Sequence, residues 1–330
     1  MNLKRIKSIL ERGLAEGAYP CYAAAVGGRE GVFFREYGGD RTVYPSRRAL
    51  TEQTLFDIAS LSKLMGTTMA ALRLIDGKRL SLESRVGEFF EGCYGKEDIS
   101  VFELMTHTSG IKAHFPLWLR GIKPSDAADA ILREPLSYET GSNAVYSCMG
   151  YILLGKIIET IENEPLDKVV SRLVFEPLGM KNALYCPSPE AICAATERDA
   201  ETGEIVCGVV HDENARFLGG VSGNAGVFCD LDDCIAFAEM LSSRGEGFLS
   251  RELFEKAITN HTPNFNEHRG LGFQLIGNRF GHNGFTGTSL YVDRESGDFA
   301  ILLTNRVHPT RENFGLFGVR NEFHGAVFGE

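Results

Sequence analysis

The spacing of apolar residues predicts a helix and then a hairpin in the first part of the chain. Near the start, apolar residues recur on one face of a helix, at Leu3, Ile6, Leu10 and Leu14. Two β-like runs follow, "CYAAAVG" and "GVFFREYG", and the glycine-rich segment 27–31 between them is typical of a turn. The segment "TLFDIAS" then leads into an apolar helical stretch that we expect to stop at Gly77 and Lys78.

The pattern changes twice further along the chain. From about residue 80 to 260 it is mostly helical and loop-rich, most clearly in "MGYILLGKIIETIE" and "LDDCIAFAEMLSS". Near the end, "RFGHNGFTGTSLYVDRESGDFAILLTNRV" predicts three strands with a tight turn at Asp293–Gly297, and "RNEFHGAVFGE" predicts a closing helix. Strands at both ends with helices between them favour an α+β fold, with one sheet built from both ends of the chain.

Composition and charge narrow the class of protein. The chain has 330 residues, of which 43% are hydrophobic and 24% charged, as in a soluble globular protein. The net charge of −10 argues against nucleic acid and against an anionic membrane surface as partners. We expect no transmembrane span, because no apolar run is long enough. Glu11 and Arg12 interrupt the first apolar positions, so we expect no secretory signal and a cytoplasmic location.

The cysteines and histidines do not show the spacing of a metal site. The chain has eight cysteines, and none of them forms a C-x-x-C motif. The eight histidines form no H-x-x-x-H motif, so we expect no metal ion. In a large chain without a signal peptide, reduced thiols are more typical than disulfides.

The pattern Ser-x-x-Lys occurs twice, at Ser60–Lys63 and at Ser109–Lys112. Gly110 follows Ser109 in a turn-like segment, so we interpret the second pair as structural. Ser60, by contrast, lies where a strand-like segment meets a helix, and helical residues three apart have Cβ atoms about 5–6 Å from each other. Lys63 can therefore reach the Ser60 hydroxyl, and the free N–H groups at a helix start can stabilise an oxyanion. The alternative is that Ser60 only caps the helix and Lys63 is solvated.

A lysine needs a lowered pKa to act as a base. Its ordinary pKa of about 10.4 must be lowered by burial or by nearby positive charge before a neutral amine is available. The residues after Lys63 are apolar, which favours partial burial. Ser62 is adjacent to Lys63 in sequence, and adjacent helical residues do not face each other.

The segment "FDIASLSKLMGTTMAALRLIDGK" resembles the first motif of the serine β-lactamase and penicillin-binding-protein superfamily, in its class C β-lactamase, D,D-peptidase and esterase branch. "LMTHTSGI" and "VYSCMGYILLGKIIE" resemble later landmarks of that branch, the second of them its Tyr-x-Asn motif. "FGHNGFTGTSLYVD" resembles its third motif, Lys-Thr-Gly or His-x-Gly. The resemblance spans nearly the whole chain, and the motifs occur in the family's order.

The resemblance implies a two-part fold with the site between the parts. An antiparallel sheet flanked by helices would comprise residues 1–78 and 265–330, and residues 79–264 would form a mostly helical domain. Ser60 would be the acylated nucleophile, and Lys63 and Tyr146 would share the proton transfer. The backbone N–H groups of Ser60 and Phe285 would form the oxyanion hole.

The resemblance implies that substrate would contact the third motif and residue 148, where this chain departs from the second motif. Substrate would lie along His282, Asn283 and Gly284, and beside Cys148, which stands where the pattern has asparagine. A thiol is a poorer donor than an amide, and a histidine at position 282 is a weaker anion clamp than lysine because it is mostly neutral at pH 7. Both departures argue against an efficient β-lactamase.

We therefore expect a serine hydrolase that acts through an acyl-enzyme on small esters, amides or cell-wall-derived peptides. Its partner would be a small-molecule substrate, and no cofactor is expected. An active class C-type β-lactamase is one alternative. A penicillin-binding or sensing module without turnover is another, and the loss of asparagine at Cys148 is its main support.

For several other candidate residues, a structural role is an alternative to a functional one. His211 and Asp212 are adjacent in a loop that either lines the cleft or only shapes it. The glycines at 220, 223 and 226 do not have phosphate-loop spacing, which favours tight turns. Cys148 is a weak candidate nucleophile, since no histidine is near it in sequence. Trp118 is either a lid element or ordinary packing.

Overall fold

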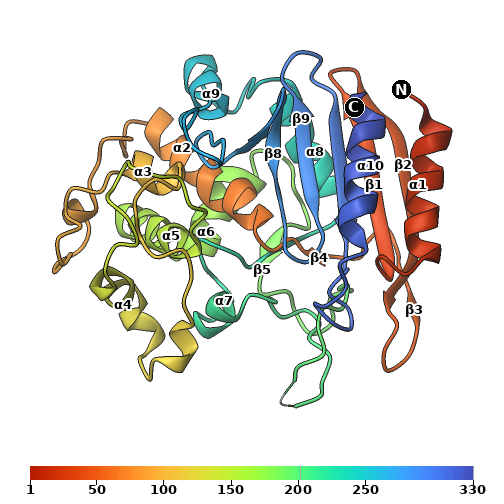
Figure 1. Ribbon diagram of the computed structural model, residues 1–330, viewed down its shortest axis with the longest axis horizontal. Coiled ribbons are helices and arrows are strands. Elements are labelled where there is room, and N and C mark those ends of the chain that lie inside the picture. Colours follow the sequence, from red (N-terminus) through yellow and green to blue (C-terminus); the bar gives the residue numbers. More distant parts are fainter. Residues whose placement is uncertain (201, 330) are drawn as a thin grey trace.

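The main sheet joins the two ends of the chain. In the computed structural model, which describes residues 1–200 and 202–329, β1 (Cys21–Gly28) pairs antiparallel with β10 (Phe299–Thr304). The strand order is β3-β2-β1-β10-β9-β8-β7 (Figure 1). The other strands of this sheet are β2 (Gly31–Thr42), β3 (Arg48–Ala49), β7 (Gln274–Ile276), β8 (Arg279–Asn283) and β9 (Ser289–Asp293). An antiparallel sheet built from both ends of the chain is what the sequence predicted.

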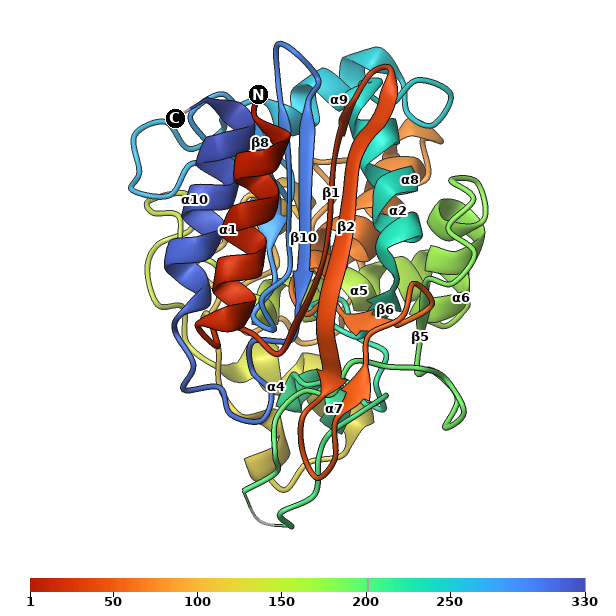
Figure 2. The same ribbon diagram turned by 90° about the vertical axis from the view of Figure 1, so that its right-hand side faces the viewer.

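Helices cover both faces of this sheet. On one face α1 (Leu3–Ala15) and α10 (Leu316–Phe328) lie side by side, and on the other lies α8 (Leu231–Ser242) (Figure 2). Because both faces are covered, β1 is buried along its whole length. Alternate residues of β1 pack on opposite faces of the sheet, in two different hydrophobic clusters. Ala24 and Val26 pack with α1 and α10, whereas Ala23 and Ala25 join the main core.

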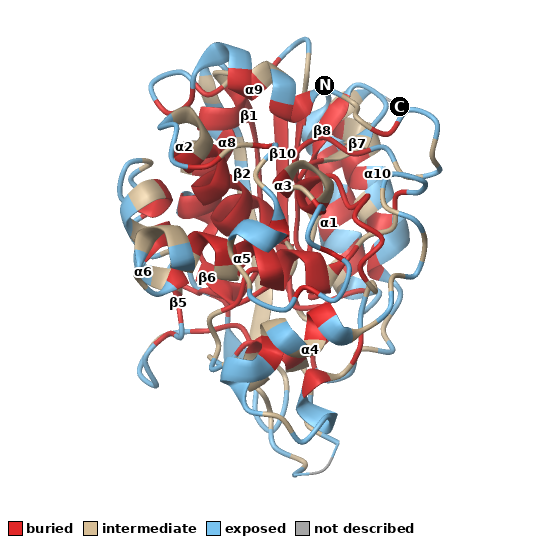
Figure 3. Cartoon of the chain, turned by 90° about the vertical axis from the view of Figure 1, so that its left-hand side faces the viewer, coloured by how far each residue is buried: buried red, intermediate tan, exposed pale blue. Residues whose placement is uncertain are grey.

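The helical part of the molecule is organised around α5 (Cys148–Glu162). This helix packs on α3 (Val101–Met105), α4 (Ala127–Arg133) and α6 (Leu166–Val170). Figure 3 shows the buried residues gathered where these helices meet the sheet. The remaining α-helices are α2 (Met69–Asp76), α7 (Glu213–Phe217) and α9 (Arg251–Ile258). Shorter helical segments are η1 (Lys63–Thr68) and η5 (Ser171–Phe175), which are π-helical, and the 3₁₀ turns η2 (Val86–Glu88), η3 (Leu117–Leu119) and η4 (Pro124–Asp126).

A second, small sheet was not predicted from the sequence. Its strand order is β4-β6-β5, formed by β4 (Phe56–Asp57), β6 (Val227–Cys229) and β5 (Leu184–Tyr185). Strands of two or three residues are too short to show alternation, so β5 and β6 were included in a region expected to be helical. This sheet is important for the site because β4 immediately precedes the turn that carries Ser60.

Most predicted elements are confirmed, with differences at their ends. The helix before Gly77 stops there, and Lys78 takes the left-handed conformation. The closing helix begins at Leu316, earlier than expected, and Glu330 and Glu201 lie outside the described residues. Within the described part of the chain, no helix has both the length and the apolar character needed to cross a membrane. The division into two domains stays a prediction.

Candidate functional site

A strained turn presents Ser60 at the edge of the cleft. Ala59, the preceding residue, has a φ of +48°, which non-glycine residues rarely adopt. The Asp57 carboxylate holds the turn by accepting the Ala59 N–H at 2.8 Å. Ser60 itself is half-buried, and its backbone N–H donates to no acceptor among the described residues. Strain of this kind is often found at functional sites.

The end of the main sheet presses against this turn. In the β8–β9 connection, the Thr286 hydroxyl donates to the Asp57 carbonyl at 2.7 Å, and the Thr288 hydroxyl donates to the Ile58 carbonyl at 3.1 Å. The N–H of Phe285, in the same connection, also has no acceptor in the described part of the chain. The two predicted oxyanion donors, Ser60 and Phe285, therefore both have free N–H groups.

Lys63 lies under Ser60. Its ammonium donates to Ser60 Oγ at 3.2 Å and to the Asn224 carbonyl at 2.8 Å, and its side chain is buried. The sequence predicted an α-helix here, whereas Lys63 begins the π-helix η1. Single π-helical turns are rare, and they occur frequently at functional sites. The wider turn still places the amine and the hydroxyl within hydrogen-bond distance.

The pKa of Lys63 is shifted in the direction opposite to the one that a base requires. Burial by itself lowers the pKa of Lys63, but the neighbouring Cys148 and Tyr146 side chains outweigh burial and raise this pKa above its usual range. We expected burial to lower it. The reason for the difference is that acidic side chains from the second motif pack against the amine, which sequence spacing does not show.

Tyr146 approaches the same lysine from the segment before α5. The Lys63 Nζ lies 4.8 Å from the centre of the Tyr146 ring. The Tyr146 hydroxyl is shielded from solvent and has no hydrogen-bond partner among the described residues. Burial raises the pKa of Tyr146, and the Lys63 charge opposes that shift. A buried hydroxyl without a partner is costly, and such a group is available to a ligand.

His107 supports the second motif and was not singled out as a site residue. Its Nδ1 accepts the Ser147 N–H at 3.1 Å, and its ring centre lies 4.8 Å from that of Tyr146. Burial holds the pKa of His107 well below its usual value, so the ring is neutral and can accept this bond. The segment "HTSG" was the available signal, although its composition indicates only a turn.

Cys148 is the first residue of α5 and is half-buried. Burial raises the pKa of its thiol, but the Lys63 charge and a hydrogen bond with His114 outweigh burial, and the pKa is lowered overall. The same hydrogen bond raises the pKa of His114. Sequence reasoning found no histidine near Cys148, because His114 is distant in sequence and only the fold brings it close.

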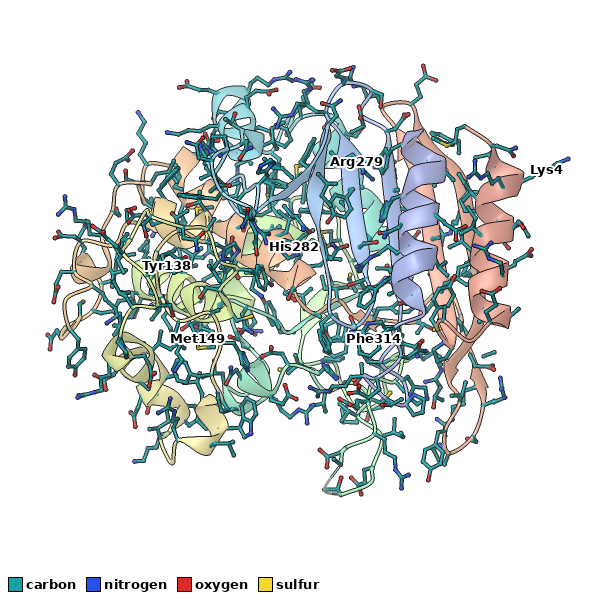
Figure 4. All side chains as sticks on the ribbon, viewed as in Figure 1. Lys4, Tyr138, Met149, Arg279, His282 and Phe314 are labelled. Carbon is teal, nitrogen blue, oxygen red and sulfur yellow. The ribbon has the colours of Figure 1, made fainter. Side chains whose placement is uncertain are left out.

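The third motif lies at the end of β8, of which His282 and Asn283 are the last two residues. Figure 4 shows His282 where the sheet meets the helical part. Burial, with the charges of Arg269 and Lys63, lowers the pKa of His282 to about 3, so the ring is neutral. The Asn283 amide donates to Gln274 at 3.1 Å and to the Tyr291 hydroxyl at 2.8 Å, which fixes the strand edge. No cation stands at position 282, as the sequence suggested.

Two adjoining cavities meet at Ser60. One, of about 340 Å³, is lined by residues that include Ser60, Tyr146, Cys148 and Phe285. The other, of about 520 Å³, is also lined by Ser60, Tyr146 and Phe285, and reaches along the third motif to residues 282–284. The predicted site residues thus come together from three distant segments, residues 60–63, 146–148 and 282–285, with Lys63 beneath the cavity floor.

The larger cavity has a cationic and aromatic wall that sequence reasoning missed. Arg306 is buried and Arg320 half-buried, and neither forms an ion pair within the described part of the chain. Burial lowers the pKa of Arg306, and the neighbouring Arg320 lowers it further. Exposed Phe314 and Phe317 stand at the rim, their ring centres 6.1 Å apart. The sequence held no signal for this wall, because its arginines come from different elements.

The remaining candidates have mainly structural roles. His211 lines the smaller cavity, but its partner is Glu197, with Nε2 3.0 Å from Oε2, and not the adjacent Asp212. Asp212 also lines that cavity and caps α7 by accepting the Ala215 N–H. Trp118 lines a neighbouring cavity of about 560 Å³.

The glycine-rich loop brings Asn224 to Lys63. A Cβ atom at Gly223 would lie 2.0 Å from the Tyr151 carbonyl oxygen, so the loop can approach α5 only with glycine there. The Gly223 carbonyl accepts the Thr67 hydroxyl at 2.8 Å. The loop therefore makes tight backbone turns, as predicted.

Comparison with known proteins connects this geometry to one family. The sequence profile of the beta-lactamase family matches residues 6–322. A Salmonella enteritidis protein, provisionally named a D-alanyl-D-alanine carboxypeptidase, is 28% identical over 331 residues, which cover 85% of this chain and 76% of that protein.

Solved structures share the fold at low sequence identity. A penicillin-binding protein homologue from Pyrococcus abyssi has a TM-score of 0.80 at 21% identity, covering 100% of this chain and 78% of that one. EstCE1, a hydrolase with promiscuous acyltransferase activity, has a TM-score of 0.79 at 20% identity, covering 98% of both chains. A D-amino acid amidase from Ochrobactrum anthropi has a TM-score of 0.80 at 18% identity, covering 99% of both chains.

Proposed function

The chain belongs to the beta-lactamase family and is a serine hydrolase, and we propose that it forms an acyl-enzyme on Ser60 with small esters, amides or cell-wall-derived peptides. The observation that carries this proposal is the 3.2 Å contact between Lys63 Nζ and Ser60 Oγ at the base of the two cavities. A nucleophile and a proton-transfer group within hydrogen-bond distance are the minimum for this chemistry.

In the proposed reaction, the Lys63–Tyr146 pair first loses one proton to solvent, because the pKa of each group is raised and the fully protonated pair cannot act as a base. Ser60 Oγ then attacks the substrate carbonyl while its proton passes to this singly deprotonated pair. The Lys63 ammonium lies 4.8 Å from the centre of the Tyr146 ring, and each group shifts the pKa of the other, so we expect them to titrate as a unit. The free N–H groups of Ser60 and Phe285 bind the developing oxyanion, and each such donor is worth roughly a hundredfold in rate. Water then attacks the acyl group from the Tyr146 side.

The cationic wall favours substrates that carry a carboxylate. The neutral His282 supplies no charge, whereas Arg306 and Arg320 line the larger cavity and form no ion pair with any carboxylate of the described residues. The Arg306 guanidinium donates to the backbone carbonyls of Phe285, Arg311 and Asn313, which hold it in place. A partly buried guanidinium is stabilised when a ligand anion pairs with it. We therefore favour small peptides with a free carboxyl group over neutral esters. The carboxypeptidase name of the Salmonella relative is consistent with this choice.

The proposal is tested by intact-protein mass spectrometry after treatment with a fluorophosphonate and, separately, with a penicillin. Wild type and Ser60→Ala are compared. We expect a stoichiometric adduct on wild type alone. Labelling of both proteins equally, or of neither, would remove the catalytic assignment. The decay rate of the penicillin adduct then separates a hydrolase from a module that binds without turnover, and turnover of a chromogenic cephalosporin would indicate a β-lactamase.

A further inference from the structure

Cys148 lies in the catalytic cleft beside groups that the proposed reaction does not use. It is half-buried on the wall of the 340 Å³ cavity, which His114, Tyr146 and Ser60 also line. The cysteine is therefore open to small molecules that enter the cleft, and it shares this space with the nucleophile.

Backbone hydrogen bonds hold the His114 segment against Cys148. The Cys148 N–H donates to the Ala113 carbonyl at 2.9 Å, and the Ser147 hydroxyl donates to the Lys112 carbonyl at 3.3 Å. Residues 112–114 are thereby fixed along the first turn of α5. His114 is exposed at the cavity mouth, with its ring centre 6.5 Å from that of Trp118. The imidazole is held next to the thiol from the solvent side.

The charges around Cys148 favour a thiolate. The ammonium of Lys63 lies on its inner side and His114 on its outer side, and the start of the 15-residue helix α5 adds a positive potential. The carboxylate of Asp212 opposes them. Glu213 and Arg311, of opposite sign, line the same cavity and form an ion pair with each other.

We infer that Cys148 and His114 form a thiolate–imidazolium pair, which makes Cys148 a second nucleophile of the cleft and a site of covalent modification by small electrophiles. With an alkyl halide such as iodoacetamide, a bond forms between Sγ and the electrophilic carbon while the carbon–iodine bond breaks. Iodide leaves with the negative charge, and no oxidant is needed. The adduct occupies the cavity beside Ser60 and blocks substrate, so hydrolysis depends on the state of this thiol.

The chain contains its own controls. Cys186 and Cys207 are more exposed than Cys148, yet burial raises the pKa of each. Thiolate fraction governs the rate of alkylation, whereas exposure alone would give the opposite order. The inference therefore predicts that the less exposed cysteine reacts faster.

The experiment is iodoacetamide labelling of the Ser60→Ala chain between pH 6 and 9, with each cysteine followed by peptide mass spectrometry. This background removes the proposed acylation, so the result does not depend on the proposed function. At pH 6.5 we expect Cys148 to react about tenfold faster than Cys186 or Cys207. In His114→Gln we expect slower labelling of Cys148 and a higher midpoint of its pH–rate curve, with an unchanged circular dichroism melting curve.

Two results would overturn the inference. The first is a Cys148 rate no greater than that of the two exposed cysteines. The second is the same midpoint with and without His114. In a separate arm, wild type alkylated at Cys148 should no longer react with the fluorophosphonate, whereas iodoacetamide treatment of Cys148→Ser should leave the reactivity of that variant at its own untreated level. If Ser60 still reacts beside a carbamidomethylated Cys148, the blocking part of the inference is wrong.

Discussion

Two segments of this chain contain a serine followed three residues later by a lysine, and the fold uses them differently. At the first, Lys63 is buried and donates to Ser60 Oγ at 3.2 Å. At the second, the Ser109 hydroxyl is buried and accepts a hydrogen bond from the backbone N–H of Ile111, two residues later. Lys112 turns outward and pairs with Glu134 at 3.0 Å.

The backbone between the two residues explains the difference. Ser60 to Lys63 follows a helical path, so the two side chains lie on one face. Between Ser109 and Lys112 the chain passes through Gly110, whose φ is +74°, and the lysine is directed away. The same three-residue spacing therefore makes a reactive pair only where a helix begins.

The largest expected effect is on the two serines. Ser60→Ala should reduce hydrolysis by about a thousandfold or more, because the nucleophile is lost. Ser109→Ala should leave kcat/KM within a factor of two, because its hydroxyl only braces a turn. Steady-state kinetics with one activated ester measures both. Comparable losses in the two variants would contradict the assignment of Ser60.

The two lysines should differ nearly as much. Lys63→Met is expected to lower kcat/KM by roughly a hundredfold to ten-thousandfold, the usual range for loss of a proton-transfer group. Lys112→Met should retain activity and lose at most about 1 kcal/mol of stability, because its ion pair is on the surface. Kinetics and urea unfolding of both variants decide the point. An active Lys63→Met would exclude the lysine from the chemistry.

Two tyrosines should differ less: removing one hydroxyl should lower activity but not stability, and removing the other should lower stability but not activity. Tyr146→Phe removes a hydroxyl that has no hydrogen-bond partner among the described residues, so we expect no loss of stability. Activity should fall by roughly a hundredfold, because the hydroxyl takes part in the proposed proton transfer. The Tyr138 hydroxyl instead donates to the His107 carbonyl at 3.0 Å, in the segment that precedes the second serine–lysine pair, Ser109–Lys112. Tyr138→Phe should cost about 1 kcal/mol and leave the rate unchanged. Thermal melting measures the stability of both variants, and steady-state kinetics measures their activity. A loss of stability in Tyr146→Phe, or a loss of activity in Tyr138→Phe, would contradict the prediction.

The smallest effect concerns the pH dependence of stability at Glu134. The hydrogen bond from Lys112 lowers the pKa of Glu134 below its usual 4.5, and Arg120 adds to this. A depressed carboxyl pKa stabilises the fold above the unfolded value and loses that contribution as the pH falls through the folded value. Wild type should exceed Glu134→Gln in stability at pH 7, by about 1 kcal/mol or less, and this difference should shrink below pH 4.5. A difference that grows in acid would show that the pair does not stabilise the fold.

Much of the fold could be predicted from the sequence because its signals are local. Helix α5 has a continuous apolar stretch after the Ser147 cap, and the β1–β2 hairpin has its turn at residues 29–30. The motif residues Ser60, Lys63, Tyr146 and His282 were likewise found from order and context. What they do in catalysis stays a prediction until it is tested.

The parts that were missed depend on tertiary contacts. The contact between His114 and Cys148 exists only because residues 112–114 pack along α5. The raised pKa of Lys63 also reflects acidic groups from another segment. The π-helical turn at Lys63 has no recognised sequence signal, and it replaces an α-helix that the apolar pattern indicated equally well.

The contacts that hold Ser60 also determine when the site can exist during synthesis. Thr286 and Thr288 bond to residues 229 and 230 positions earlier, and Lys63 bonds to a carbonyl 161 positions later. A nascent chain that has exposed only its first half therefore contains the nucleophile without the contacts that hold it in place. Contacts of such long sequence separation also slow folding. The growing chain should thus remain inert toward acyl donors until its last strands have left the ribosome.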